Sequence, residues 1–146
     1  MTAERIETCI AGPFSGWSGE TAFDLCNGQV WGQVEYAYLY QYAYRPNVVL
    51  ELSGSGWTLS VQGVRHTIRV RQVDDFVRSC IDGTFDGWTG DTTFELANGQ
   101  VWKQDRYAYL YHYAYRPSVL IYLAPSGGYR MLVEGLTETL PVSLVR

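Results

Sequence analysis

Residues 14–33 read FSGWSGETAFDLCNGQVWGQ, and residues 85–104 read FDGWTGDTTFELANGQVWKQ. The likeness extends without gaps over residues 9–52 and 80–123. The chain is therefore a tandem duplication. Two copies are too few for a solenoid, which needs about three repeats. We expect two small domains that share one fold.

The domain limits follow from the alignment of the two copies. It places one domain near residues 4–73 and the other near residues 76–146, with Asp74 and Asp75 between them. Such a short linker holds the two domains close together.

Each copy has the sequence pattern of an all-β chain. An Asn-Gly pair, at residues 27–28 and again at 98–99, separates two alternating runs. This is the strongest short signal for a β-hairpin, here with a type I′ turn. No segment shows an apolar period of 3.6 residues. Many short strands in so small a unit favour a strongly bent barrel. Further strands are expected near residues 5–11, 48–52, 57–61 and 67–71, and near 78–82, 119–123, 129–133 and 139–144.

A run of alternating tyrosines follows the hairpin in each copy. In a strand, alternate side chains share one face. We call the first run, Tyr36, Tyr38, Tyr40, Tyr42 and Tyr44, the first tyrosine row. The second tyrosine row is Tyr107, Tyr109, Tyr111, Tyr113 and Tyr115.

The hairpin register predicts where the rows point. A two-residue Asn-Gly loop pairs Leu25 with Val30 and puts Phe23 on the same core face. An unbroken strand would then turn all five tyrosines inward, which is too many for a small barrel. A single bulge, for which Gly32 is a candidate, would reverse the parity. We expect the N-terminal end of each row to pack in its barrel and the C-terminal end to leave it.

The exposed end of each row needs a partner. The first candidate is the sister repeat, meeting its copy about a pseudo-two-fold axis as in an isologous dimer. The others are a second copy of the chain or another protein, single-stranded nucleic acid stacking its bases on the rings, and a small molecule. The predicted binding residues are Tyr40, Tyr42, Tyr44 and Arg45, with their equivalents Tyr111, Tyr113, Tyr115 and Arg116.

Charge and hydropathy bear on which of these classes of partner is expected and on where the chain is located. The net charge is −4 and both halves are acidic, which disfavours nucleic acid as a partner, because phosphate contacts need a basic face. Arg65, Arg69 and Arg71 are interpreted as a solvated strand face or a guarded strand edge. No apolar run is long enough to span a membrane. The N-terminus lacks the apolar stretch of a signal peptide, so a cytoplasmic location is predicted.

The cysteines indicate neither disulfides nor zinc. There are 3 of them, an odd number, and they form no CxxC motif. Cys9 and Cys80 are interpreted as small buried hydrophobic residues.

Signals for catalysis are weak. His66 and His112 differ between the copies, and no phosphate-binding loop or nucleophile elbow is present. The recurring acids, Glu20 with Asp91 and Asp24 with Glu95, are interpreted as a solvated strand face. We predict no enzyme activity, no cofactor and no metal. The alternative is a small-molecule enzyme with its site at the symmetric interface, built from tyrosines with Gln33 and Gln104.

The motif F-x-G-W-x-G-x-T-x-F-x-L-x-N-G-Q-V-W-x-Q followed by Y-x-Y-x-Y-x-Y-x-P stands at residues 14–46 and again at 85–117. It resembles a family of small bacterial all-β proteins with no assigned activity. The resemblance implies SH3-like barrels and no catalytic residues. We therefore predict two tandem SH3-like β-barrels related by a pseudo-two-fold axis, with one merged β-sandwich as the alternative. The predicted function is that of a non-enzymatic interaction module.

Overall fold

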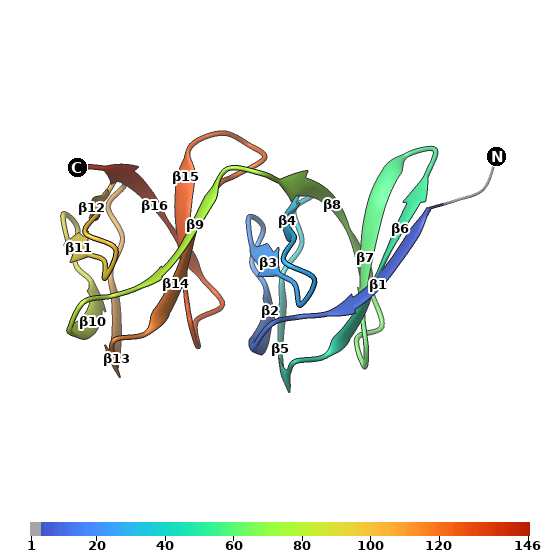
Figure 1. Cartoon of the computed structure of the whole chain (residues 1–146), viewed down its shortest axis with the longest axis horizontal. Helices are drawn as coiled ribbons and strands as arrows, with labels where there is room; N and C mark the ends of the chain where they lie inside the picture. Colours follow the sequence, from blue (N-terminus) through green and yellow to red (C-terminus); the bar gives the residue numbers. More distant parts are fainter. Residues whose placement is uncertain (1–3) are drawn as a thin grey trace.

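The computed structural model describes residues 4–146, which form sixteen β-strands and no helix (Figure 1). None of the described residues belongs to a helix long and apolar enough to cross a membrane. The all-β prediction is confirmed. The first repeat contains β1 (Arg5–Cys9), β2 (Pro13–Trp17), β3 (Ala22–Asp24), β4 (Val30–Gln33), β5 (Leu39–Tyr44), β6 (Asn47–Ser53), β7 (Gly56–Val61) and β8 (Thr67–Val73). The second repeat contains β9 (Phe76–Cys80), β10 (Thr84–Trp88), β11 (Thr93–Glu95), β12 (Val101–Gln104), β13 (Leu110–Tyr115), β14 (Ser118–Leu123), β15 (Tyr129–Val133) and β16 (Thr139–Leu144).

Both repeats have the same sheet topology. The first has a six-stranded sheet in the order β1-β6-β7-β8-β4-β3 and a separate pair, β2 with β5. The second repeats this as β9-β14-β15-β16-β12-β11, with β10 paired to β13. Each sheet contains strands of one repeat only, so the merged β-sandwich is wrong. β8 lies between β7 and β4, so its exposed Arg69 and Arg71 form a solvated strand face and not a guarded edge.

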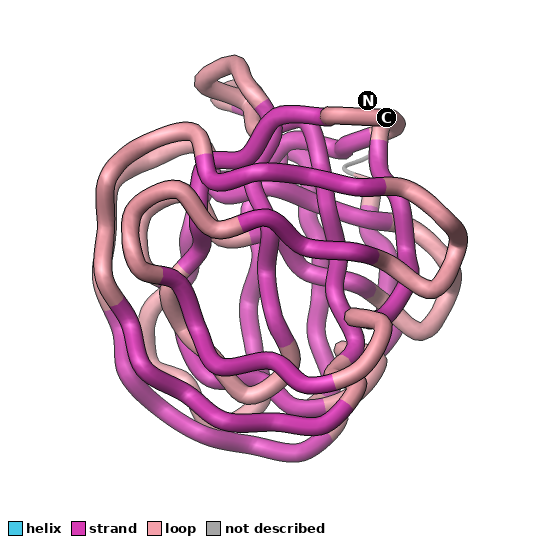
Figure 2. Tube along the Cα trace, turned by 90° about the vertical axis from the view of Figure 1, so that its left-hand side faces the viewer, coloured by secondary structure: helices cyan, strands magenta, loops and turns pink. Residues whose placement is uncertain are grey.

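Each six-stranded sheet curls until its two edge strands meet (Figure 2). An isolated bridge joins Ile10, just after β1, to Leu25, just after β3. The Cys26 N–H donates to the Cys9 carbonyl at 2.7 Å, and the Ala11 N–H donates to the Asp24 carbonyl at 2.8 Å. The curled sheet therefore satisfies edge groups that an open sheet would expose.

The hairpin between β3 and β4 differs from the predicted one by one residue. Phe23 pairs with Trp31, and the Leu25 N–H donates to the Gln29 carbonyl. The loop thus holds three residues, and Gly28 has a positive φ of 89° whereas Asn27 does not. A three-residue loop with one left-handed glycine replaces the type I′ turn. The predicted pairing of Leu25 with Val30 is wrong.

This register decides which side chains reach the core. Phe23, Leu25 and Trp31 lie in the core of the first repeat, and Phe94, Leu96 and Trp102 lie in that of the second. Val30, predicted to share the core face, lies on the opposite face. Gly32 is regularly paired with Ala22 and makes no bulge. Trp17 and Trp88 are buried packing residues.

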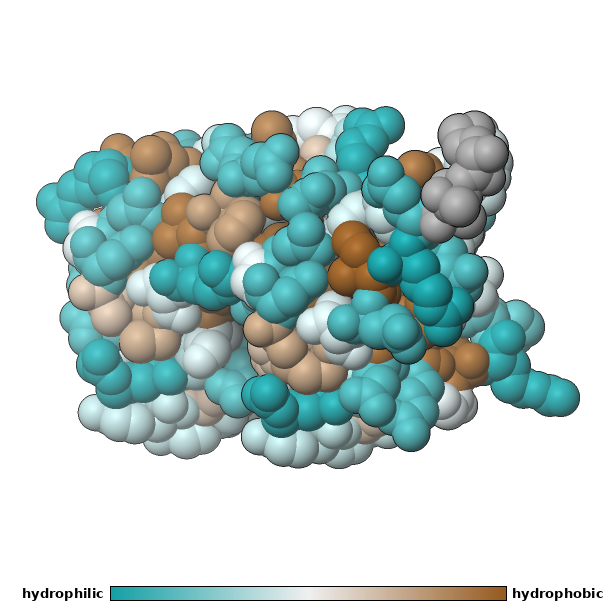
Figure 3. Space-filling view, turned by 45° about the vertical axis from the view of Figure 1, so that its right-hand side comes forward, coloured by the Kyte–Doolittle hydropathy of each residue, from teal (hydrophilic) through white to brown (hydrophobic). Residues whose placement is uncertain are grey.

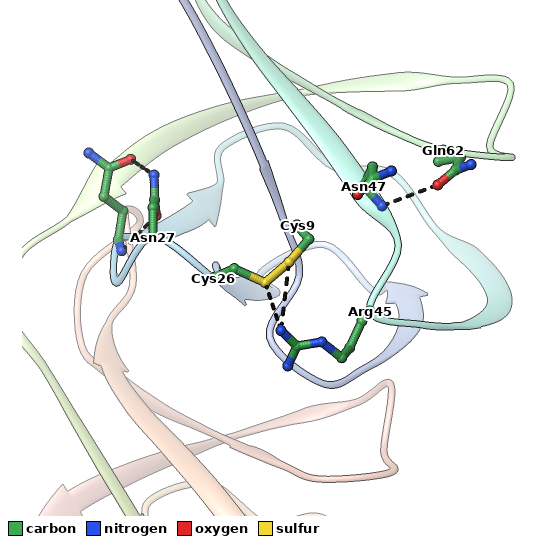
Figure 4. Close-up of a disulfide and its surroundings, with 7 residues drawn as sticks. Cys9, Cys26, Asn27, Arg45, Asn47 and Gln62 are labelled. Carbon is green, nitrogen blue, oxygen red and sulfur yellow. Dashed lines mark hydrogen bonds between the residues drawn. A yellow bond between two sulfur atoms is a disulfide. The ribbon is translucent and has the colours of Figure 1, made fainter.

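A disulfide joins Cys9 to Cys26 across the meeting point of the sheet edges (Figure 4). Their Cα atoms lie 5.2 Å apart, because the two backbones are already hydrogen-bonded there. The prediction of no disulfide is wrong. Ala97 takes the place of Cys26 in the second repeat, so Cys80 stays a free thiol. Cys9 and Cys80 are half-buried rather than buried.

The repeats pack against each other through a third apolar cluster. Its buried members are Ala22, Val30 and Val73 from the first repeat and Leu120, Tyr122 and Ala124 from the second. Tyr122 is fully buried and its hydroxyl donates to the Glu20 carbonyl. Burial raises the pKa of the Tyr122 phenol, so this ring packs as a neutral group.

Polar contacts surround this cluster. Arg78 donates to both carboxylate oxygens of Asp24 at 2.7–3.0 Å. Arg130 donates to Glu20 at 3.1 Å, and the Thr137 hydroxyl donates to the Ser15 carbonyl at 2.9 Å. Glu20 and Asp24 are therefore interface residues rather than members of a solvated face.

The pseudo-two-fold axis is wrong, because the surfaces that meet are not equivalent. The first repeat contributes β3, β4 and the end of β8, and the second contributes β9 and β14 with neighbouring residues. The first-repeat residues equivalent to Arg78 and Tyr122 are Glu7 and Glu51, both exposed. Figure 1 shows the two repeats side by side in the same orientation. The contact is head-to-tail, the heterologous type.

Gly32 provides a test of this interface. A Cβ built on Gly32 would lie 3.0 Å from Pro125 of the second repeat and 3.1 Å from Val73. We expect Gly32→Val to lower the free energy of unfolding by about 1–3 kcal/mol in urea denaturation, because the site is already packed. The matched control is Lys103→Val at the equivalent exposed position, expected to change it by less than about 0.5 kcal/mol. Equal unfolding curves for both variants would contradict the interface.

The disulfide provides a second test. Cys9 and Cys26 are 17 residues apart, so their bond removes roughly 3 kcal/mol of chain entropy from the unfolded state. We expect Cys26→Ala, or reductant, to destabilise the first repeat by about that amount in urea. Cys80→Ala is the control and should leave the effect of reductant unchanged. A thiol assay should find one reactive group in the oxidised unfolded chain, and three would show that the bond does not form.

Candidate functional site: two exposed tyrosine rows

The side chain of Gln33 fixes the segment that leads into the first tyrosine row. Gln33 is 2% exposed. Its Oε1 accepts from the N–H groups of Gly19 and Thr21, and its Nε2 donates to the carbonyls of Glu35 and Ala37, both at 3.0 Å. Gln104 repeats all four bonds in the second repeat. Because their amides are buried and bonded to the backbone, these residues position the rows and do not form the suggested catalytic group.

A glycine lets β5 cross closely over β2. Gly16 pairs with Tyr40 beside an irregularity in the β2–β5 register, and its φ is +99°. A Cβ at Gly16 would overlap the carbonyl oxygen of Leu39. Gly87 has the same conformation and the same close approach to Leu110. Both repeats therefore require glycine here to seat the tyrosine-bearing strand.

The rows point outward along their whole length. Ala37, Leu39 and Ala43 pack against the core, so the alternating tyrosines face away from it. The exposed fraction of the ten rings ranges from 62% for Tyr38 and Tyr113 to 87% for Tyr36. The expectation that the N-terminal ends pack inside is wrong, because Tyr36, Tyr38, Tyr107 and Tyr109 are also exposed.

The sister repeat does not cover the rows. Tyr42 is 67% and Tyr113 is 62% exposed, and the repeats meet through other residues. β5 and β13 lie along the same lower side in Figure 1. Atoms of intermediate hydropathy, the class of tyrosine, line the lower side of both repeats in Figure 3. The predicted residues Tyr40, Tyr42, Tyr44, Tyr111, Tyr113 and Tyr115 thus belong to one side of the molecule.

An arginine in an unusual conformation ends each row. Arg45 and Arg116 both have φ of +49°, and among the described residues they are the only non-glycine residues with positive φ. Each also precedes a proline, which further restricts its backbone. The Arg45 guanidinium lies 3.5 Å from the Cys26 sulfur (Figure 4), whereas Arg116 donates to Asp82 at 2.9 Å. Both arginines are exposed.

A cleft of about 370 Å³ lies between the repeats, beside the end of the first row. Tyr44 and Ser15 line it from the first repeat, and Ser79, Ser118 and Glu134 line it from the second. The Asp24–Arg78 ion pair also borders it. The sequence predicted an interface site only for a symmetric contact of the repeats, and of the residues predicted for any site only Tyr44 lines this cleft. The missed signal was the set of differences between the copies, such as Arg78 at the position equivalent to Glu7.

The histidines do not form a reactive group with the rows. His66 is exposed, and His112 is half-buried with its ring centroid 6.4 Å from that of Phe85. Within residues 4–146, no three His, Cys, Asp or Glu side chains lie together as a metal site would require. The rows thus offer rings, phenol hydroxyls and two guanidinium groups.

Comparisons with known proteins give no match: no protein-family model, curated protein or solved structure is similar to this chain. The resemblance to a family of small bacterial all-β proteins stays a prediction, and the functional argument rests on the geometry of the rows.

The backbone at Arg45 can be tested for strain. A left-handed backbone conformation costs a non-glycine residue about 1–2 kcal/mol, and substitution by glycine removes this cost. Glycine also gives the unfolded chain more conformational entropy, which offsets part of the gain in stability. We expect Arg45→Gly to raise the free energy of unfolding by about 0.5–1 kcal/mol in urea denaturation. Arg65→Gly, at an exposed position without positive φ, is the control and should not stabilise. A loss of stability in Arg45→Gly would show that the conformation is not strained.

Proposed function

We propose that this chain is a non-enzymatic binding module whose ligand lies across the two tyrosine rows. The observation that carries the proposal is the exposure of all ten rings on one side of a rigid frame. Monomeric proteins seldom present aromatic surface of this extent without a ligand for it. The predicted contacts are Tyr40, Tyr42, Tyr44 and Arg45, with Tyr111, Tyr113, Tyr115 and Arg116, and the exposure of Tyr36, Tyr38, Tyr107 and Tyr109 extends both rows.

The type of aromatic residue in the rows supports a binding surface rather than a set of core residues left exposed. Every Phe and Trp of the chain is buried or half-buried, whereas all ten row positions are Tyr. Tyrosine offers a large contact area at a low cost in conformational entropy and keeps a hydroxyl for hydrogen bonding. The rows are thus suited to a ligand that is partly apolar and partly polar.

The backbone lock at Gln33 and Gln104 supports a preformed surface. Four hydrogen bonds from each amide hold the segment before the row, and the Gly16 and Gly87 crossings hold the row strand. A preformed face loses little ordering entropy when its ligand binds. We propose that each frame is a small SH3-like barrel, a view supported by the curled sheet and its edge bridge.

The proposal also covers the class of partner that the chain binds and its cellular location. The acidic net charge of −4 favours a partner that is not a polyanion. A cytoplasmic location stays a prediction, and the disulfide opposes it, because such bonds are rare in reducing compartments.

The test is the loss of binding when one ring is removed from each row. The variant Tyr42→Ser/Tyr113→Ser should bind at least about tenfold more weakly than the native chain, because each stacked ring contributes roughly 1–3 kcal/mol. The control Tyr42→Phe/Tyr113→Phe keeps both rings and should retain most of the affinity. Binding is measured by biolayer interferometry against immobilised neutral polysaccharides, oligo-dT and the chain itself.

Two results would contradict the proposal. One is the absence of binding to every probe. The other is binding that the serine variant retains in full, which would place the ligand away from the rows. Circular dichroism of both variants controls for folding, and since the substituted rings are exposed, we expect unchanged spectra.

A further inference from the structure

The cleft between the repeats borders the end of the first tyrosine row. Tyr44, the last ring of the first row, lines it on one side. Gly135, Leu136 and Thr137 line it on the other, and a Cβ on Gly135 would lie 3.8 Å from Nε2 of His112 in β13. Since β13 carries the second row, the cleft is bordered by both row-bearing repeats.

The size and walls of the cleft suit a ligand with many hydroxyl groups. Its volume of about 370 Å³ falls in the usual range for small-ligand sites. Asp24 and Arg78 form a charge-balanced pair that offers acceptors and donors together, and Glu134 adds a further carboxylate. Ser15 and Ser79 supply hydroxyls, and Leu120 and Leu132 supply apolar surface. Such a mixture of charged, hydroxyl and apolar groups fits a sugar ring.

We propose that the tyrosine rows and this cleft form one binding face for a neutral glycan chain. The proposal rests on the proposed function and names the ligand class. The rings of the rows stack on the apolar C–H faces of successive sugar residues. The cleft holds one sugar residue by hydrogen bonds to Glu134 and the serine hydroxyls.

The regular spacing of the rings supports a polymeric ligand. Alternate residues of a strand lie about 6.7 Å apart, so the three tyrosines of each row that lie in β5 or β13 repeat one aromatic contact at a fixed interval. A repeating ligand can use every ring, whereas a folded protein partner concentrates its binding energy in a few packed pockets. The large exposed aliphatic side chains among the described residues, such as Leu123, Leu144 and Val145, lie outside the rows, so the rows present tyrosine rings and not aliphatic groups.

Charge separates a glycan from a nucleic acid. The cleft is bordered by Asp24 and Glu134, and the only cation among its lining residues, Arg78, is already paired with Asp24. Arg116 at the end of the second row is paired with Asp82. A phosphate backbone would meet the uncompensated carboxylate of Glu134 here, whereas a neutral sugar would use it as a hydrogen-bond acceptor.

The duplication creates the cleft, and this offers a matched control. Gln62 in the first repeat is the equivalent of Glu134. Its Oε1 accepts from the Asn47 N–H (Figure 4), just as Glu134 Oε1 accepts from the Ser118 N–H in the second repeat. Both residues are exposed, but only Glu134 lines the cleft. Substituting either one removes the same local hydrogen bond, so any difference in binding reports the cleft.

The experiment is affinity electrophoresis of the full chain in gels that contain one neutral polysaccharide each: a β-1,4-glucan, a β-1,3-glucan, an α-glucan or a galactomannan. We expect retardation by at least one of them. Oligosaccharides of that glycan, titrated by calorimetry, should bind more tightly as their length increases. Tyr42→Ser/Tyr113→Ser should weaken binding at least about tenfold. Glu134→Ala should weaken it about tenfold through the lost hydrogen bond, whereas Gln62→Ala should not.

The outcomes separate this inference from the proposed function. Row-dependent binding to oligo-dT or to a protein, with no neutral glycan bound, overturns the glycan and leaves the binding module intact. Glycan binding that Glu134→Ala does not affect overturns the role of the cleft. The absence of row-dependent binding to any probe overturns both proposals. Calorimetric melting of each variant distinguishes lost binding from lost folding.

Discussion

The pairing of Phe23 with Trp31 in the β3–β4 hairpin is the constraint on which the rest of the structure depends. It turns Trp31 and Gln33 toward the core and leaves Ala22 and Val30 on the opposite face. That opposite face is the one that packs against the second repeat. β4 ends at Gln33, and β5 belongs to a separate pair with β2, so the outward direction of the tyrosines follows from the packing of Ala37, Leu39 and Ala43 against the core. The hairpin register thus produces the interface between the repeats, and the packing of the row-bearing segment produces the exposed rows.

Most of the strands could be predicted from the sequence, but β2, β10 and the direction of the tyrosines could not. The Asn-Gly pair is compatible with a two-residue and a three-residue loop, and the two choices differ by one residue in register. The three-residue loop places the Cys26 N–H against the Cys9 carbonyl, where the edges of the sheet meet. This contact joins residues that are far apart in the sequence, so the sequence of the hairpin alone does not predict it. The apparent need for a bulge at Gly32 arose only from the wrong register.

The residues that the two copies share form the cores and the tyrosine rows, whereas the residues that differ form the contact between the repeats. Tyr122 replaces Glu51, Arg78 replaces Glu7, and each substitution serves the interface. Gly32 accommodates Pro125, and Lys103 takes its place where no repeat packs. The differences alone do not tell which faces meet. A pseudo-two-fold axis was therefore expected where the structure has a head-to-tail contact, and the cleft beside that contact was missed.

A head-to-tail contact leaves an unused copy of each surface at the two ends of the molecule, and such contacts can propagate into filaments. The end residues oppose this. A third repeat docked in the same way would bring Glu7 toward Glu95, the equivalents of Arg78 and Asp24. It would also bring Glu51 toward Asp91, the equivalents of Tyr122 and Glu20. Two carboxylates would replace the ion pair, and a carboxylate facing a backbone carbonyl would replace the buried hydrogen bond, so both contacts would be unfavourable. The divergence of the copies therefore opposes the docking of a third repeat in this way.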